Sequence, residues 1–174
     1  MKFIPIDKTN IDLAISIQHH LFPEYNGEIN YRESLIKEEN KTYFLIEEDG
    51  NIVGITGLYF YKVDPTSAWL GWFGILEEYR RLHLGSKALK MFEEMAKEQG
   101  FKTVRLYTDK YDNEVAINFY KANGYTEEDY VLDEDPASKI YPLFIFSKSL
   151  DGSKVTRWNN KNIGFTKQTE KQVY

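Results

Sequence analysis

The feature that most constrains this chain is a change of pattern midway along it. Three apolar stretches, residues 42–47, 52–61 and 68–75, follow one another with only short turns between them. Strands joined this tightly pair antiparallel, so the stretches predict a meander. From residue 84 onward, apolar side chains recur at helical spacing instead. The sequence therefore predicts a sheet that begins with hairpins and continues through crossover helices.

The same two periodicities predict the other elements. A short strand and two helices precede the meander, and a helix, a strand, a second helix and a pair of strands follow it. Their expected bounds are 2–7 for the first strand, 10–22 and 31–39 for the two helices, 84 to just before Gly100 for the next helix, 103–108 for a strand, 114–122 for a helix, and 125–132 and 140–150 for the last strands. Leu35 and Ile36 are expected to face inward. The strand at 103–108 follows a crossover helix and is expected to run parallel to the strand before it.

No repeat or low-complexity linker divides the chain. We therefore predict an α/β fold in which residues 1–150 form a single mixed central sheet with helices on both faces. Residues 151–174 are predicted to be a C-terminal extension, basic on an otherwise acidic chain, that packs on the body or on a homodimer partner. A disordered tail is the alternative.

Composition excludes several classes of protein. The chain has no cysteine, which rules out disulfides, thiolate metal sites and a cysteine nucleophile, and its three histidines do not predict a metal site. The net charge of −5 argues against nucleic-acid binding, which needs a basic surface. The first residues lack the apolar stretch of a signal peptide, and no window approaches a membrane span. We expect a cytoplasmic protein with neither a membrane nor a nucleic-acid partner.

The candidate chemistry begins where the last meander strand runs into a helix. Residues 71–86 pass from an apolar strand, through a polar turn with Arg80 and Arg81, directly into the helix. The first turn of a helix has unpaired N–H groups and the positive end of the helix dipole, which together bind phosphate groups. Gly85 allows close backbone approach, and Ser86 adds a hydroxyl. Taken alone, the segment could equally be a surface turn that contains arginine and glycine.

A second candidate segment is residues 113–125, with the sequence N-E-V-A-I-N-F-Y-K-A-N-G-Y. Ala116, Phe119 and Tyr120 recur at helical spacing, so this helix presents a small and an aromatic surface. Taken alone, Tyr120 could be a buried tyrosine whose hydroxyl is bonded to a carbonyl.

Together, the two segments resemble the GCN5-related N-acetyltransferase (GNAT) superfamily. Residues 79–86 match its pyrophosphate-loop motif, Arg/Gln-x-x-Gly-x-Gly/Ala, and residues 113–125 match its next motif position by position. The predicted order of elements over 1–150 is also that of the superfamily. The resemblance implies its fold, with a splayed pair of parallel strands. It also implies an enzyme that moves the acetyl group of acetyl-CoA, its co-substrate, to a primary amine of a small molecule or peptide by direct attack.

The resemblance further implies roles for individual residues. The end of the meander would pair with the pantetheine arm, the amides of the turn would hold the pyrophosphate, and Asn113 would bond the arm. The predicted cofactor-binding residues are Gly74, Ile75, Leu76, Arg80, Arg81, Leu82, His83, Leu84, Gly85, Ser86 and Asn113. Tyr120 is the predicted catalytic residue, a general acid beside the thioester sulfur.

One position departs from the motif, because His83 stands where the superfamily has its first glycine. Histidine adds a Cβ at the phosphate approach, although it tolerates unusual φ better than most residues. The departure puts the affinity for acetyl-CoA in question. His83 is not predicted to be a catalytic base, because the phosphate end of the cofactor lies far from the thioester.

Neither the general base nor the acceptor follows from the sequence. Many members of the superfamily place a carboxylate on the strand at 68–75, and here that strand has none. The remaining candidates for the base, each of which could also be a solvated surface charge, are Glu24, Glu28 and Glu33. An aromatic wall for a cationic acceptor, or simply part of the core, could be formed by Tyr59, Tyr61, Trp69 and Trp72. The acidic net charge favours a small amine or polyamine as the acceptor.

The sequence leaves two alternatives from other classes of function. A catalytically degenerate member could bind acyl-CoA as a sensor or scaffold, which His83 and the missing carboxylate favour and Tyr120 disfavours. An unrelated nucleotide-binding α/β module would need a Rossmann-type glycine fingerprint, which the sequence lacks.

Overall fold

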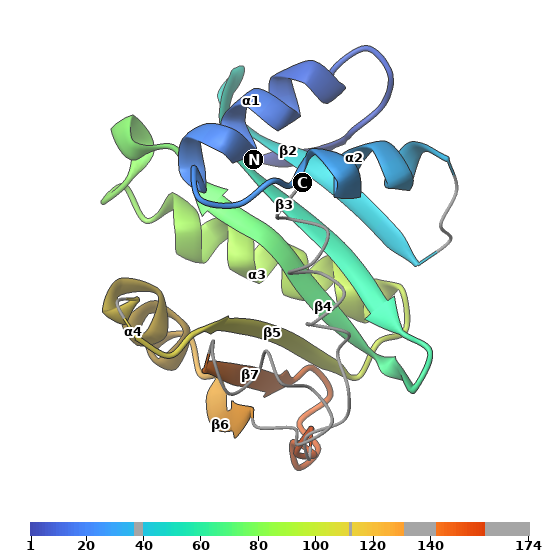
Figure 1. The fold of residues 1–174 in the computed structure, drawn as a ribbon. Coiled ribbons are helices and arrows are strands. Elements are labelled where there is room, and N and C mark those ends of the chain that lie inside the picture. Colours follow the sequence, from blue (N-terminus) through green and yellow to red (C-terminus); the bar gives the residue numbers. More distant parts are fainter. Residues whose placement is uncertain (37–39, 112, 131–141, 159–174) are drawn as a thin grey trace. The chain divides into compact units, whose positions relative to one another are not determined.

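The computed structural model describes residues 1–36, 40–111, 113–130 and 142–158, which belong to two compact units, Met1–Phe101 and Lys102–Tyr174. Figure 1 shows the course of the chain. In the first unit the elements are β1 (Lys2–Pro5), α1 (Ile11–Leu21), α2 (Glu28–Leu35), β2 (Lys41–Glu48), β3 (Asn51–Tyr61), β4 (Asp64–Ile75), the short 3₁₀ helix η1 (Glu77–Tyr79) and α3 (Leu84–Glu98). In the second unit they are β5 (Thr103–Asp109), α4 (Glu114–Ala122), β6 (Thr126–Tyr130) and β7 (Leu143–Ser149).

The sheet of the first unit is the predicted meander. Strands β1 to β4 pair antiparallel in sequence order. The β2–β3 hairpin turns at Asp49 and Gly50, whose φ values of 50° and 82° are both left-handed. Two left-handed residues are what a type I′ turn requires, and Asp-Gly is a favoured pair for it. The Asp-Gly dipeptide therefore fixes the register of this hairpin.

Helices cover both faces of this sheet because neighbouring strand residues point to opposite sides. Leu45 and Ile55 pack into one cluster with α1 and α2. Ile46 and Val53 pack into another with Ala88 of α3. Figure 1 shows α3 along the sheet and α1 and α2 on its other side. Because alternate side chains of each strand point to opposite faces, the α1–α2 pair packs on one face of the sheet and α3 on the other.

The second helix differs from its prediction. It begins at Glu28 rather than at residue 31, and it ends at Leu35. Its start is held by contacts that periodicity does not reveal: the Gly27 N–H donates to Gln18 Oε1 and the Glu28 N–H donates to Asn26 Oδ1. Ile36 lies past the helix end and is 81% exposed, so the expectation that it faces inward was wrong.

The strands of the second unit pair antiparallel in the order β5, β7, β6. Leu106 faces Phe146 across the β5–β7 ladder, and Glu128 faces Ile145 across the β6–β7 ladder. The predicted ends of the last two strands, 131–132 and 140–141, lie outside the described residues. Tyr120 of α4 packs on Phe146, with ring centroids 5.6 Å apart.

Thr156 and Trp158 of the predicted C-terminal extension contact Arg105 of β5. Trp158 is fully buried, and the guanidinium of Arg105 lies over its ring at 5.6 Å. Arg105 also donates to Thr156 Oγ1 and to Ser147 Oγ. Residues 159–174 lie outside the described residues, so the role predicted for 151–174 as a whole stays a prediction.

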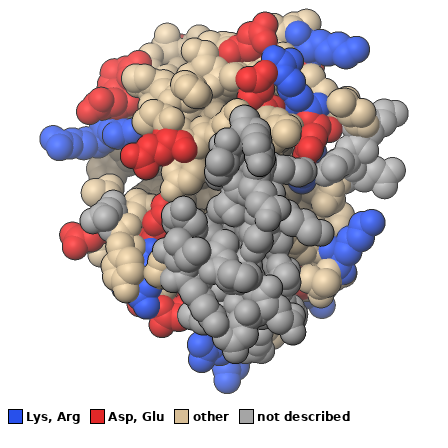
Figure 2. All heavy atoms as spheres, viewed as in Figure 1, with Lys and Arg blue, Asp and Glu red and all other residues tan. Residues whose placement is uncertain are grey.

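The described surface carries charges of both signs. Figure 2 shows acidic and basic side chains interspersed over the visible face. None of the described helices has the length and apolar character needed to cross a bilayer.

Candidate active site

The site begins at a bulge in β4. Gly71 pairs with Gly57, and Gly74 pairs with Ile55, so Thr56 of β3 faces both Trp72 and Phe73. Trp72 takes up the extra residue with a left-handed φ of 46°. Two residues opposite one define a β-bulge, which bends the strand and changes the direction of its side chains.

Gly74, the first strand residue assigned to the pantetheine arm, lies directly after the bulge. A Cβ built on Gly74 would lie 2.9 Å from Leu21 Cδ1 and 3.2 Å from Phe22 Cζ. Glycine therefore lets the end of α1 pack closely on this part of β4. Ile75 is buried, and the Leu76 N–H donates to the Val53 carbonyl, which ends the strand.

The turn between β4 and α3 is shaped by two left-handed residues. Arg81 has a φ of 62° and His83 a φ of 59°. His83 thus adopts a backbone conformation that glycine reaches more readily than other residues. Histidine is among the residues that reach this region more often than most, so it is compatible with this backbone. Arg80 Nε donates to the Ile75 carbonyl at 3.0 Å, which ties the turn to the strand end.

The first turn of α3 has donors available for an anion. His83 is the N-cap residue, and no described side chain caps the helix. The Lys87 N–H is the first to bond within the helix, to the His83 carbonyl at 3.1 Å. The amides of Leu84, Gly85 and Ser86 precede it, and such groups have no intrahelical partner. The turn around them is exposed, with Leu82 60% accessible, so a phosphate group could approach.

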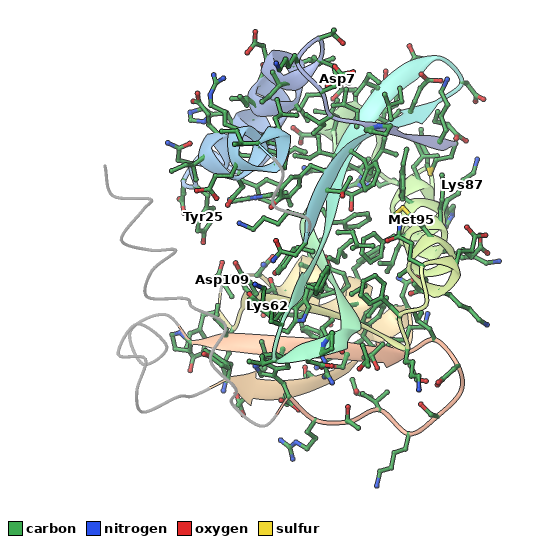
Figure 3. All side chains as sticks on the ribbon, turned by 90° about the vertical axis from the view of Figure 1, so that its right-hand side faces the viewer. Asp7, Tyr25, Lys62, Lys87, Met95 and Asp109 are labelled. Atoms are coloured by element: carbon green, nitrogen blue, oxygen red, sulfur yellow. The ribbon has the colours of Figure 1, made fainter. Side chains whose placement is uncertain are left out.

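A charge pair flanks this helix start. Lys87, labelled in Figure 3, projects from the first turn of α3 and forms an ion pair with Glu48. The hydrogen bond from Lys87 is the main reason that the pKa of Glu48 lies below its usual value, and a second comes from the amino group of Met1. Lys87 is therefore already engaged by a carboxylate.

In the second unit, Asn113 and Tyr120 belong to the start and the last turn of α4. Asn113 is the N-cap residue, but its side chain does not cap the helix: Nδ2 donates to Thr108 Oγ1 at 2.5 Å. This bond leaves the amide oxygen of Asn113 as its acceptor group. Tyr120 is 7% exposed and packs edge to face on Tyr125. Burial raises the pKa of Tyr120 above its ordinary value, which already keeps the hydroxyl protonated at neutral pH.

The sequence profile described as "Acetyltransferase (GNAT) family" matches residues 11–125. The chain belongs to the GNAT family of acetyltransferases. An N-alpha-acetyltransferase of Sulfurisphaera tokodaii is 31% identical to it over 129 residues, which cover 68% of this chain and 76% of that protein.

Solved structures of GNAT enzymes share the fold. The ribosomal-protein-S18-alanine N-acetyltransferase of Escherichia coli matches with a TM-score of 0.68 at 15% identity, over 90% of this chain and 98% of that one. A variant of the spermidine N-acetyltransferase of Vibrio cholerae matches with a TM-score of 0.68 at 13% identity, over 87% and 96% of the two chains. The predicted fold class is thereby confirmed.

Membership of the GNAT family makes the chain an acetyl-CoA-dependent acetyltransferase. The start of α3 fits such a co-substrate, because it combines uncapped amides with an exposed turn. The structure places the predicted residues Gly74 to Ser86 in one continuous stretch of the first unit. The roles of these residues, and those of Asn113 and Tyr120, stay predictions.

The candidates for the general base differ in their contacts. Glu28 pairs with Arg32, and Glu33 pairs with Lys41, while Glu24 is exposed. Strand β4 is longer than predicted and begins at Asp64, whose carboxylate accepts from the hydroxyls of Thr66 and Ser67. None of these contacts marks one carboxylate as the base.

The predicted aromatic wall divides into two groups. Tyr59 and Tyr61 both pack on the buried Trp69. Trp72 instead packs on Phe22 and Tyr25, with ring centroids 5.4 and 6.3 Å away. The first group belongs to the core of the sheet, and the group around Trp72 lies at the bulge.

Two residues near these sites were not anticipated from the sequence. Thr108 holds the side chain of Asn113, and Gln18 holds the segment between α1 and α2. Gln18 falls on the helical stripe that predicts the first helix, and Thr108 ends a predicted strand, but neither pattern reveals these hydrogen bonds, which join residues five or more positions apart. Only the folded backbone brings these pairs together.

Proposed function

We propose that this protein acetylates a primary amine of a small molecule or peptide by direct attack of the amine, without an acyl-enzyme. The observation that carries the proposal is the uncapped first turn of α3, preceded by the left-handed residues Arg81 and His83. Bound acetyl-CoA supplies the acetyl thioester. The amides of Leu84, Gly85 and Ser86 bind its pyrophosphate, with the positive charge of Arg81 nearby in the turn.

Tyr120 supports the step in which the thiolate departs. A tyrosine hydroxyl is protonated at neutral pH, and burial raises the pKa of Tyr120 further, so Oη carries a proton that it can donate to the sulfur. Asn113 contributes an amide oxygen that can accept an N–H from the pantetheine arm, and Thr108 fixes its orientation. These roles are those that the family motif implies for the matching positions.

Among amines, we propose the α-amine of a peptide as the preferred acceptor. An α-amine has a pKa near 8, so losing a proton at pH 7 costs about 1.4 kcal/mol, against about 4.6 kcal/mol for a lysine-like amine of pKa about 10.4. The stretch of β4 at 68–75 offers no carboxylate to lower that cost. The relationship to an N-alpha-acetyltransferase supports the same choice.

A thiol-release assay with two acceptors tests the proposal. An alanine-initiated tetrapeptide and spermidine are each supplied with acetyl-CoA, and turnover is followed from pH 6 to 10. For the peptide we expect kcat/KM to rise about tenfold per pH unit and to level off near pH 8. Turnover of spermidine alone would identify a polyamine enzyme. Binding of acetyl-CoA with no turnover of either acceptor would support the sensor alternative instead.

A further inference from the structure

Gln18, near the end of α1, is a fully buried polar side chain whose two ends bond the same segment. Its Nε2 donates to the Tyr25 carbonyl at 2.9 Å, and its Oε1 accepts from the Gly27 N–H at 3.0 Å. Both partners lie in residues 22–27, which we call the α1–α2 connection. A buried amide that satisfies both of its ends on one loop holds that loop in a single conformation.

Gly27 lies in close contact with the side chain of Gln18. Its backbone, at φ −84° and ψ −10°, is in the helical region that any residue adopts, so glycine is not required for its conformation. A Cβ there would instead lie 2.6 Å from Gln18 Cδ and 2.8 Å from Gln18 Oε1. Glycine is therefore needed to make room for Gln18.

The connection rests on the part of β4 that carries the bulge. Phe22 and Tyr25 pack on Trp72, and Phe22 also lies against Gly74. Figure 3 shows Tyr25 at the end of the α1–α2 pair. Gly74 is the strand residue assigned to the pantetheine arm, and the amine must reach the thioester at the end of that arm. The connection is thus a neighbour of the reacting groups within the first unit.

We propose that Gln18 is a positioning residue for the amine acceptor: by binding the Tyr25 carbonyl and the Gly27 N–H, it keeps the α1–α2 connection ordered against β4, where the acceptor is received. The proposal rests on the proposed function. Gln18 itself touches no substrate. Its loss leaves the start of α3 and its amides unchanged, so it affects acceptor binding and not acetyl-CoA binding.

The test replaces Gln18 with methionine, which has a similar length but cannot make either hydrogen bond. The matched control is Gln99→Met, at an exposed glutamine of the same unit. If only about one molecule in ten keeps the connection ordered, KM for the acceptor rises about tenfold. We expect this rise in Gln18→Met with kcat and the Kd of acetyl-CoA within about twofold of the parent, and no change in Gln99→Met. The acceptor is the better of the tetrapeptide and spermidine.

Amide hydrogen exchange provides a readout that does not depend on activity. In Gln18→Met the Gly27 amide should exchange at least about tenfold faster, while amides of β2 and β3 keep their protection. Gly27→Ala breaks the same contact from the other side and should raise the acceptor KM in the same way. It also serves if Gln18→Met does not fold.

Three outcomes would overturn the proposal. The first is unchanged Gly27 exchange together with an unchanged acceptor KM. The second is a loss of acetyl-CoA affinity by the same factor as the rise in acceptor KM. Gln18 would then stabilise the first unit as a whole and not the α1–α2 connection in particular. The third is a parent protein that acetylates neither acceptor, which refutes the proposed function and with it the acceptor role. Turnover of the parent therefore distinguishes the two failures.

Discussion

The β4–α3 turn and helix α4 carry the two family motifs, but they differ in which atoms matter. The turn offers backbone amides, and its side chains from Arg80 to His83 are exposed. Helix α4 offers side chains, the Asn113 amide and the buried Tyr120 hydroxyl. A site built from backbone depends on conformation and tolerates a change of residue, whereas a site built from side chains depends on identity. The comparison predicts large effects on rate at α4, and effects at the turn that follow backbone shape and space.

The largest effect should come from removing the hydroxyl of Tyr120. Tyr120→Phe keeps the ring that packs on Tyr125 and Phe146, so stability and acetyl-CoA affinity should stay near those of the parent. Only the proton for the departing thiolate is lost, and kcat should fall about 10²- to 10⁴-fold. Steady-state turnover and calorimetry on both proteins measure the two quantities. Normal turnover with a large loss of stability would make Tyr120 a core residue only.

Filling space at the turn should have the next largest effect. In Gly85→Val a branched side chain stands where the pyrophosphate must approach the amides. Losing about two charge-assisted hydrogen bonds should weaken acetyl-CoA binding at least about 100-fold. Lys90→Val, at an exposed position of the same helix, controls for the lower helix propensity of valine. Calorimetry showing equal affinity in Gly85→Val and the parent would place the pyrophosphate elsewhere.

A smaller effect is expected from freeing Asn113. Thr108→Val preserves shape but removes the acceptor for Asn113 Nδ2. The affinity for acetyl-CoA should fall about three- to tenfold, the range of one neutral hydrogen bond, with kcat little changed. Thr126→Val is the matched control, because Thr126 is also a strand threonine whose hydroxyl bonds within the second unit. Equal losses of affinity in the two variants would mean that Thr108 has no special relation to Asn113.

The smallest effect should come from restoring the family residue at position 83. Because His83 already has a left-handed φ, His83→Gly relieves backbone strain in the folded state. It also raises the conformational entropy of the unfolded chain, which opposes this gain. Stability should change by about 0–1 kcal/mol in favour of glycine, and acetyl-CoA affinity should be unchanged or slightly higher. His83→Ala should be less stable than either protein. A large loss of turnover in His83→Gly at normal acetyl-CoA affinity would instead make His83 a chemical participant.

The parts of the structure that could be predicted are those encoded by local pattern. The Asp49-Gly50 pair specifies its turn, and the two-residue period of β2 and β3 specifies which side chains face α1 and which face α3. Motif matches identified the family and predicted the two segments of the candidate site. These signals need no knowledge of distant contacts.

The parts that could not be predicted depend on contacts between distant residues or on uncommon backbone. Trp72 and Arg81 have left-handed φ, although neither residue type favours it. The sequence therefore does not indicate the bulge at Trp72 or the backbone conformation at Arg81. The early start of α2 depends on Gln18, nine residues before Gly27. The sequence shows that residue 83 is a histidine, but not that its φ is left-handed. The effect of this departure from the motif on the predicted phosphate site therefore could not be judged from the residue type.

The central claim, that backbone amides at the start of α3 bind the pyrophosphate, is tested most directly by nuclear magnetic resonance. Amide spectra are recorded while coenzyme A is added, and again with pantetheine, which lacks the pyrophosphate. The account predicts large shifts of the Leu84, Gly85 and Ser86 amides with coenzyme A and small ones with pantetheine. Equal shifts with both ligands, or none at these three amides with saturating coenzyme A, would contradict it.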